Sequence, residues 1–215
     1  MLISEQKKFI FVHNQKTGGV SIANYLRDQA QDCITLLPNH AYAIDGISKI
    51  GRGVWDQHYS FGFVRNPWSR LVSWYQMIVN PPQKPENSKG QWTPNNGLWK
   101  YVQEHSSTFE EFLDNCTDII SENRDGFIYQ KSFTKNQIDY FTDASGTLAV
   151  NFVGRFEQLQ EDFDKVTTAL NLPQTKLPIL NVGPTTDYRT FYTERTKQLV
   201  AERFKKDIEI FGYSF

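Results

Sequence analysis

The strongest constraint on the fold is an alternation of short apolar runs with longer amphipathic stretches. FIFV (residues 9–12) precedes GVSIANYLRDQA, FGFV (residues 61–64) precedes PWSRLVSWYQMIV, and AVNFV (residues 149–153) precedes EQLQEDFDKVTTAL. Uninterrupted apolar runs are typical of strands covered on both faces, and strand–helix alternation favours parallel strands joined by helical crossovers. The pattern therefore predicts an α/β fold with a central parallel sheet.

The remaining segments indicate how the chain is organised. TERTKQLVAERFKKDIEIFGY (residues 193–213) carries apolar side chains at helical spacing and predicts one helix that ends at Gly212. With 215 residues, 39% of them hydrophobic, the chain can build one large core or at most two small ones, and we expect a single domain over residues 1–215. Residues 80–97, NPPQKPENSKGQWTPNNG, exclude regular structure and predict a lid, an acceptor-binding loop or a disordered segment.

The composition limits the classes of partner and the location. Because 23 Lys and Arg residues are balanced by 24 Asp and Glu, we expect no nucleic-acid partner, and any anion site must be local. No segment reaches the roughly 20 apolar residues of a membrane span, and the N-terminus has no hydrophobic signal core. We expect a cytoplasmic protein. Cys33 and Cys116 lie far apart without a metal-ligand pattern and are expected to be small buried hydrophobes.

The segment KFIFVHNQKTGGVS (residues 8–21) joins a predicted strand to a predicted helix through a loop with two glycines. Such a junction presents backbone N–H groups and the positive end of a helix dipole, and glycine lets the backbone approach a ligand. A lysine charge and hydroxyl donors would complete a phosphate-type site. A glycine turn with a solvated lysine is the alternative, and the ATPase phosphate loop differs because its lysine follows the glycines. The candidate residues are Lys16, Thr17, Gly18, Gly19, Val20 and Ser21.

The segment FVRNPWSRLVSWY (residues 63–75) forms a second junction of the same kind. Arg65 ends the predicted strand, Asn66 can cap the next helix, and Pro67 suits its first turn. The planar fork of arginine matches a phosphate group, and Ser73 would add a donor if the loop bends back over the helix. In the alternative reading, Arg65 pairs with a carboxylate at the sheet edge and Ser73 is an ordinary surface serine.

The two junctions, in this order, resemble the sulfotransferases that use 3'-phosphoadenosine 5'-phosphosulfate, especially carbohydrate sulfotransferases of the heparan 2-O type and their bacterial relatives. The family pattern K-T-G-G-T/V-S is matched at residues 16–21, and F-V-R-N/D-P-x-x-R-L-x-S-x-Y at residues 63–75. VGRFEQLQEDF (residues 153–163) and the final FGYSF are also similar, so the resemblance covers most of the chain. It implies a P-loop-NTPase-like three-layer sandwich, with the 5'-phosphosulfate at residues 16–21 and the 3'-phosphate at Arg65 and Ser73.

Sulfuryl transfer needs a positive charge on the departing bridging oxygen and a base for the acceptor proton. Lys16 fits the first role. The resemblance implies His40 as the base, because His40 lies between the two phosphate motifs, where relatives carry a histidine. An Asp or Glu serves in other branches, and His58, beside the second strand, is more typical of a structural residue. The predicted catalytic residues are therefore Lys16 and His40, and no metal-ligand cluster is evident.

The acceptor follows only from the resemblance, which implies a hydroxyl on a carbohydrate. Lys84 and Lys89, beside Trp92 and Trp99, could face a sugar. Two other classes stay open. A nucleotide-dependent small-molecule kinase would need carboxylates for magnesium, and a non-catalytic nucleotide-binding module would bind adenosine 3',5'-bisphosphate without transferring a group. The sequence does not indicate the oligomeric state.

Overall fold

The computed structural model describes residues 1–80, 97–117, 134–178 and 187–215, which form two compact units. The first unit contains Met1–Asn66 and Asn136–Leu180, and the second contains Pro67–Lys135 and Asn181–Phe215. The single domain expected over residues 1–215 stays a prediction. Most of the loop predicted at residues 80–97 lies outside the described residues.

The first unit is built around a five-stranded sheet with the strand order β3-β1-β2-β4-β5. β2 (Phe9–Val12), β4 (Tyr59–Val64) and β5 (Phe152–Arg155) are parallel neighbours. β1 (Leu2–Ser4) is antiparallel to both β2 and β3 (Ile34–Thr35). The α/β class and the mostly parallel central sheet are confirmed. The hairpin of β1 and β2 was not predicted, because the run LIS is too short to indicate a strand.

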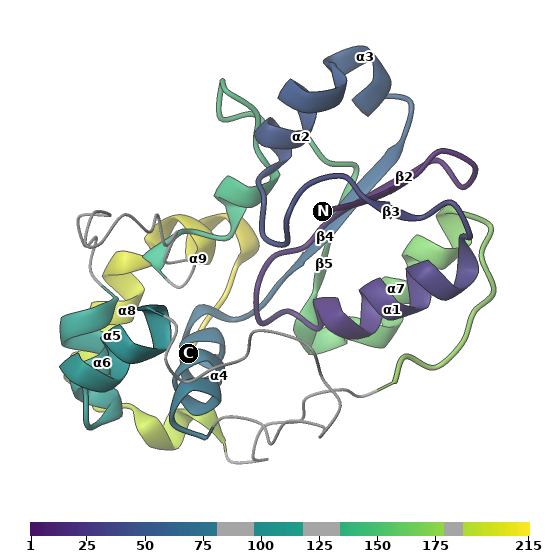
Figure 1. Ribbon diagram of the computed structural model, residues 1–215. Helices are drawn as coiled ribbons and strands as arrows, with labels where there is room; N and C mark the ends of the chain where they lie inside the picture. Colours follow the sequence, from purple (N-terminus) through teal and green to yellow (C-terminus); the bar gives the residue numbers. More distant parts are fainter. Residues whose placement is uncertain (81–96, 118–133, 179–186) are drawn as a thin grey trace. The chain divides into compact units, whose positions relative to one another are not determined.

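Helices flank this sheet, and α1 (Gly19–Gln29) and α7 (Leu159–Ala169) lie side by side against it (Figure 1). Their contact includes Tyr25 and Phe163, whose ring centroids are 5.0 Å apart. The sheet contributes buried phenylalanines to the same core: Phe9, Phe11, Phe61 and Phe63. α1 and α7 therefore anchor the residues that follow β2 and β5.

The other face of the sheet contacts the 3-10 helix η2 (Ile138–Phe141). A Cβ atom at Gly62 of β4 would lie 2.2 Å from the ring of Phe141, so only glycine leaves room for this contact. Before β4 the chain forms α2 (Ala43–Ile50) and α3 (Arg52–Trp55). Trp55 at the end of α3 is buried and donates from its Nε1 to the Ala149 carbonyl at 2.7 Å.

The second unit is helical over its described residues. It contains α4 (Pro67–Val79), α5 (Gly97–His105), α6 (Phe109–Cys116) and the 3-10 helix η4 (Tyr188–Phe191). The C-terminal segment forms two helices, α8 (Glu194–Arg203) and α9 (Lys205–Phe211). The prediction of one helix was wrong, because Phe204, which is buried, leaves helical geometry (φ −111°, ψ 25°). Gly212 ends α9 in the left-handed conformation, as predicted.

Two smaller expectations concern cysteines and membrane spans. Cys33 and Cys116 are not joined in a disulfide; Cys116 is buried, and Cys33 is partly buried against the core of the first unit. Among the helices in the described part of the chain, none has both the length and the apolarity to cross a membrane.

Candidate functional site

Three parallel strands end at the same edge of the sheet, and the residues that follow them carry the candidate site. β2 leads into the loop before α1, β4 leads into Arg65, and β5 leads into the 3-10 helix η3 (Phe156–Gln158). Ligands of open α/β sheets bind outside the carboxyl ends of the strands. This edge is therefore where the residues predicted from the sequence should meet.

Two glycines form the junction between β2 and α1. Gly18, the N-cap of α1, has φ 78° and ψ 8°, and a Cβ atom there would lie 2.7 Å from Leu159 Cδ2. A Cβ atom at Gly19 would lie 2.1 Å from the ring of His13. The first helical bond runs from the Ile22 N–H to the Gly18 carbonyl at 3.4 Å. The N–H groups that precede it have no acceptor inside the helix, so this end of α1 can bind an anion.

Lys16 lies in the same loop with φ 66°, a left-handed conformation that is uncommon for a residue with a side chain. The pKa of Lys16 is lowered from 10.5 to about 8, mainly by burial and in smaller part by the positive charge of Arg65. An anion bound between the two cations would favour the charged form of Lys16. The strained backbone and the lowered pKa are both typical of a functional position.

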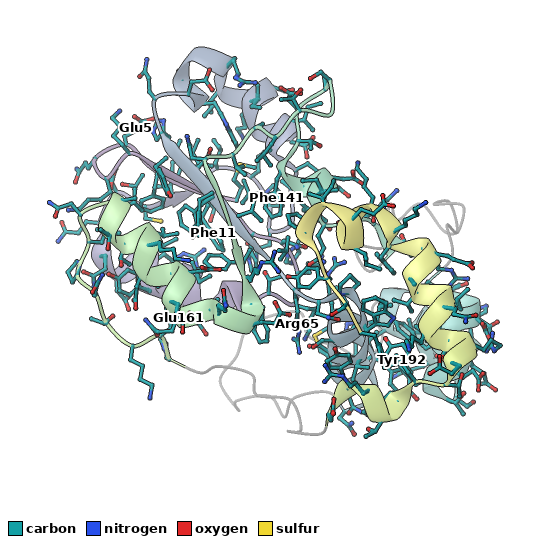
Figure 2. The ribbon with its side chains drawn as sticks, turned by 180° about the vertical axis from the view of Figure 1, so that it is seen from behind. Glu5, Phe11, Arg65, Phe141, Glu161 and Tyr192 are labelled. Atoms are coloured by element: carbon teal, nitrogen blue, oxygen red, sulfur yellow. The ribbon has the colours of Figure 1, made fainter. Side chains whose placement is uncertain are left out.

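Arg65 follows β4 and points toward this loop (Figure 2). Its Nη1 donates to the Lys16 carbonyl at 3.3 Å, and its guanidinium carbon lies 4.2 Å from the ring centroid of Phe156. The structure therefore brings together the two cations that the sequence placed in separate motifs.

His40 lies beside the same loop. Its Nδ1 is 3.1 Å from the His13 carbonyl, and the two imidazole centroids are 4.8 Å apart. Because a carbonyl oxygen only accepts hydrogen bonds, Nδ1 carries the proton and neutral His40 has its lone pair at Nε2. His13 is buried and stacked on Phe11. Its pKa is lowered from 6.5 to about 3, mainly by burial and then by His40, so His13 is neutral near pH 7.

The other predicted residues are placed differently. Thr17 is buried, and its Oγ1 donates to the Asn14 carbonyl at 2.9 Å, so this hydroxyl holds the loop. On α1, Val20 is exposed and Ser21 is buried. Ser73 is half-buried on α4 of the second unit, so its predicted partnership with Arg65 stays a prediction.

Sequence reasoning missed two amides that hold the site. Asn14 Nδ2 donates to the Phe63 carbonyl at 3.1 Å and to Gln137 Oε1 at 3.2 Å, and Gln137 also bonds to the backbone of Arg65. Asn14 stands inside the first motif and could have been considered there. No local signal marks Gln137, because it lies 72 residues after Arg65.

His58 and His105 each bond to the backbone carbonyl four residues earlier in the chain. His58 is buried, its Nδ1 donates to the Val54 carbonyl at 2.8 Å, and its Nε2 lies 3.4 Å from Glu5. His105 Nδ1 donates to the Tyr101 carbonyl at 2.8 Å within α5. In the part of the chain that the structure describes, no group of three or more His, Cys, Asp or Glu residues could hold a metal ion.

Comparison with known proteins identifies the family to which the chain belongs. The family model of the sulfotransferase family matches residues 1–214, which include both strand–helix junctions. Searches of curated proteins and of solved structures each found no match. The match confirms the sulfotransferase family that the two motifs predicted, and the heparan 2-O type stays a prediction. The chain therefore belongs to the sulfotransferase family, whose members are transferases that move a sulfuryl group.

Proposed function

We propose that the protein transfers a sulfuryl group from 3'-phosphoadenosine 5'-phosphosulfate to an acceptor hydroxyl on a carbohydrate. The observation that carries this proposal is the contact between Arg65 and the Lys16 loop at the N-terminus of α1. The donor has anionic groups at both its 5' and 3' positions, so it needs a cradle of amides and a second, separate cation. The two junctions supply one of each.

In this proposal the loop of residues 16–21 holds the 5'-phosphosulfate. The bond between sulfur and the bridging oxygen breaks, a bond forms between sulfur and the acceptor oxygen, and negative charge collects on the departing phosphate. The Lys16 ammonium group stabilises that charge. The N–H groups of Gly19 and Val20 donate hydrogen bonds to oxygens of the phosphosulfate. Arg65 binds the 3'-phosphate, as the second motif predicts, and the resemblance adds Ser73 to this role.

His40 would take the proton of the acceptor hydroxyl at Nε2. Its Nδ1–H bond to the His13 carbonyl supports this role, since it selects the tautomer with a basic Nε2. The neighbouring His13 is a poor alternative base, because its lowered pKa, about 3, leaves its imidazole with little affinity for a proton. The two histidines thus have separate tasks, although their rings are in contact.

The choice of a carbohydrate acceptor rests on the resemblance to the heparan 2-O type. Of the side chains expected to face a sugar, Trp99 is only 7% exposed in the second unit, whereas Lys84, Lys89 and Trp92 lie outside the described residues. The acceptor class therefore needs a direct test.

A transfer assay with donor labelled at the sulfuryl group tests the whole proposal. The acceptor panel contains sugars, phenols, lipids and peptides, and each reaction is also run with ATP and magnesium in place of the donor. We expect a labelled sugar and an equal amount of adenosine 3',5'-bisphosphate. Transfer of phosphate from ATP would indicate a kinase instead, and nucleotide binding without transfer to any acceptor would indicate a binding module.

A further inference from the structure

Gln137 is a fully buried amide at the carboxyl end of β4. It precedes η2 and belongs to the first unit, as Arg65 does. Its Oε1 accepts from the Arg65 N–H at 2.9 Å, and its Nε2 donates to the Arg65 carbonyl at 2.7 Å. The side chain therefore bonds to both backbone polar groups of Arg65, the cation that we assign to the 3'-phosphate.

This two-point contact has a definite effect on Arg65. The pairing of β4 with β5 ends at Val64 and Arg155, one residue before Arg65. Beyond that point, the carboxamide of Gln137 bonds to Arg65 as the backbone of a neighbouring strand would. Bonds to both N–H and C=O restrict the backbone dihedrals of Arg65. They consequently set the direction in which its side chain leaves the chain.

Gln137 also reaches the other half of the donor site. The same Oε1 accepts from Asn14 Nδ2 at 3.2 Å, and Asn14 begins the turn that ends at Lys16 and Thr17. Arg65 Nη1 in turn donates to the Lys16 carbonyl at 3.3 Å. Hydrogen bonds thus link Asn14 to Gln137, Gln137 to Arg65 and Arg65 to Lys16, and the chain from Asn14 to Lys16 completes the connection between the two strand ends.

The geometry points to Gln137 as a positioning residue of the donor site, which holds Arg65 at a set place relative to the Lys16 loop. This inference rests on the proposed function, in which Arg65 binds the 3'-phosphate. Gln137 itself does not contact the donor. Its loss should weaken binding of nucleotides with a 3'-phosphate and leave binding of AMP nearly unchanged.

Asn151 provides a matched control at the other end of the same strand. Its Oδ1 accepts from the N–H of Ser60 at 2.8 Å and from the Ser60 hydroxyl at 2.9 Å, near the start of β4. Asn151→Ala therefore removes side-chain bonds to the β4 backbone, as a Gln137 variant does, but away from the donor site. Both variants should lower the thermal unfolding midpoint, and only the Gln137 variant should alter nucleotide choice.

The test uses the full chain and measures dissociation constants for adenosine 3',5'-bisphosphate and AMP by calorimetry. Gln137→Met keeps the side-chain volume and removes the polar contacts, and Gln137→Asn keeps an amide that is too short to bridge. We expect the preference for the bisphosphate to fall about tenfold in Gln137→Met, as for one or two lost hydrogen bonds. KM for the sulfuryl donor should rise more than kcat falls.

The outcomes separate the two proposals. A folded Gln137→Met protein with the wild-type preference overturns the role of Gln137 and leaves the proposed function intact. If Gln137→Met does not fold, Gln137→Asn decides by the same ratio. An equal loss of preference in Asn151→Ala would show a general effect of β4 stability and would also overturn the inference. A wild-type protein without any preference overturns the assigned 3'-phosphate site, and this inference with it.

Discussion

The two strand–helix junctions have similar sequences in outline, but they offer different groups to a ligand. After β2, the N–H groups at the start of α1 precede the first helical bond, so the backbone itself can donate. After β4, the Arg65 N–H is bonded to Gln137, the Asn66 N–H is bonded to Glu157 at 2.7 Å, and Pro67 has no N–H. The first junction is therefore an amide cradle, whereas at the second the N–H groups of Arg65 and Asn66 are already bonded and the Arg65 side chain is the candidate anion ligand.

This difference predicts how each junction responds to mutation. A backbone cradle depends on the space around its glycines and on the one charge in the loop. A side-chain site depends on the guanidinium of Arg65 and on the contacts that orient it, such as those of Gln137. The predictions below test these dependences, from the largest expected effect to the smallest.

Removing the charge of the cradle should have the largest effect. We expect Lys16→Ala to reduce transfer about 100-fold or more, comparable to the loss of one oxyanion donor, and to leave the fold intact. Lys8→Ala is a matched control, since Lys8 is also a lysine with positive φ (50°), but it is exposed and paired with Glu5. Steady-state rates with labelled donor make the comparison. Near-normal turnover by a folded Lys16→Ala protein would rule out the proposed role.

Replacing the proposed base should cost about 100-fold in turnover while nucleotide binding is kept. His40→Asn is the preferred variant, because asparagine tolerates the left-handed backbone found at His40 (φ 72°). If His40→Asn stays fully active while His58→Ala is inactive and folded, the base has been assigned to the wrong histidine.

Mutation of the second junction should mainly change the preference between nucleotides. Arg65→Ala should lower the preference for adenosine 3',5'-bisphosphate over AMP by about tenfold or more, because charge-assisted hydrogen bonds to the 3'-phosphate are lost. The measurement is the difference in thermal stabilisation by the two nucleotides. Arg52→Ala serves as the control, since its exposed guanidinium pairs with Asp56 and Asp143 instead. An unchanged preference in Arg65→Ala would contradict the assignment of the second motif.

Crowding the cradle should produce a smaller, mostly structural effect. Gly19→Ala places a Cβ atom 2.1 Å from the His13 ring, so the ring or the start of α1 must move. We expect a loss of about 1–3 kcal/mol in the free energy of unfolding and weaker nucleotide binding. Gly53→Ala is the control, because no atom lies within 4 Å of a Cβ atom there. Equal effects of the two substitutions in denaturant titrations would show that His13 does not restrict this position.

The difference between the junctions also explains what the sequence could predict. Each junction consists of consecutive residues, so local sequence patterns predicted the cradle at residues 16–21 and the strand end at Arg65. Gln137 and Glu157 reach these junctions from 72 and 91 residues away along the chain, and no spacing rule connects them. The break at Phe204 was missed for a similar reason, since helical periodicity continues through a residue whose burial depends on tertiary packing.

The smallest effect expected is a pH dependence of the cradle that follows from the pKa of Lys16, about 8. Above this pH the ligand-free protein loses the Lys16 charge, so the dissociation constant for adenosine 3',5'-bisphosphate should rise as the pH increases from 8 to 9. Because a bound anion favours protonated Lys16, binding in this range should take up a proton. Calorimetry in buffers with different ionisation enthalpies measures that uptake. Lys16→Arg stays charged throughout and should show neither effect.

The same group should change stability in the opposite direction. The pKa of Lys16 is lower in the folded chain than its ordinary value of 10.5, so between about pH 8 and 10.5 the unfolded state binds more protons. The contribution of Lys16 to the free energy of unfolding therefore increases with pH in this window. If nucleotide binding by the wild-type protein weakens with pH while its stability stays constant or rises relative to Lys16→Arg, the cause is deprotonation of Lys16. Weaker binding that instead follows a parallel loss of stability in both proteins would assign the effect to alkaline unfolding and contradict the prediction.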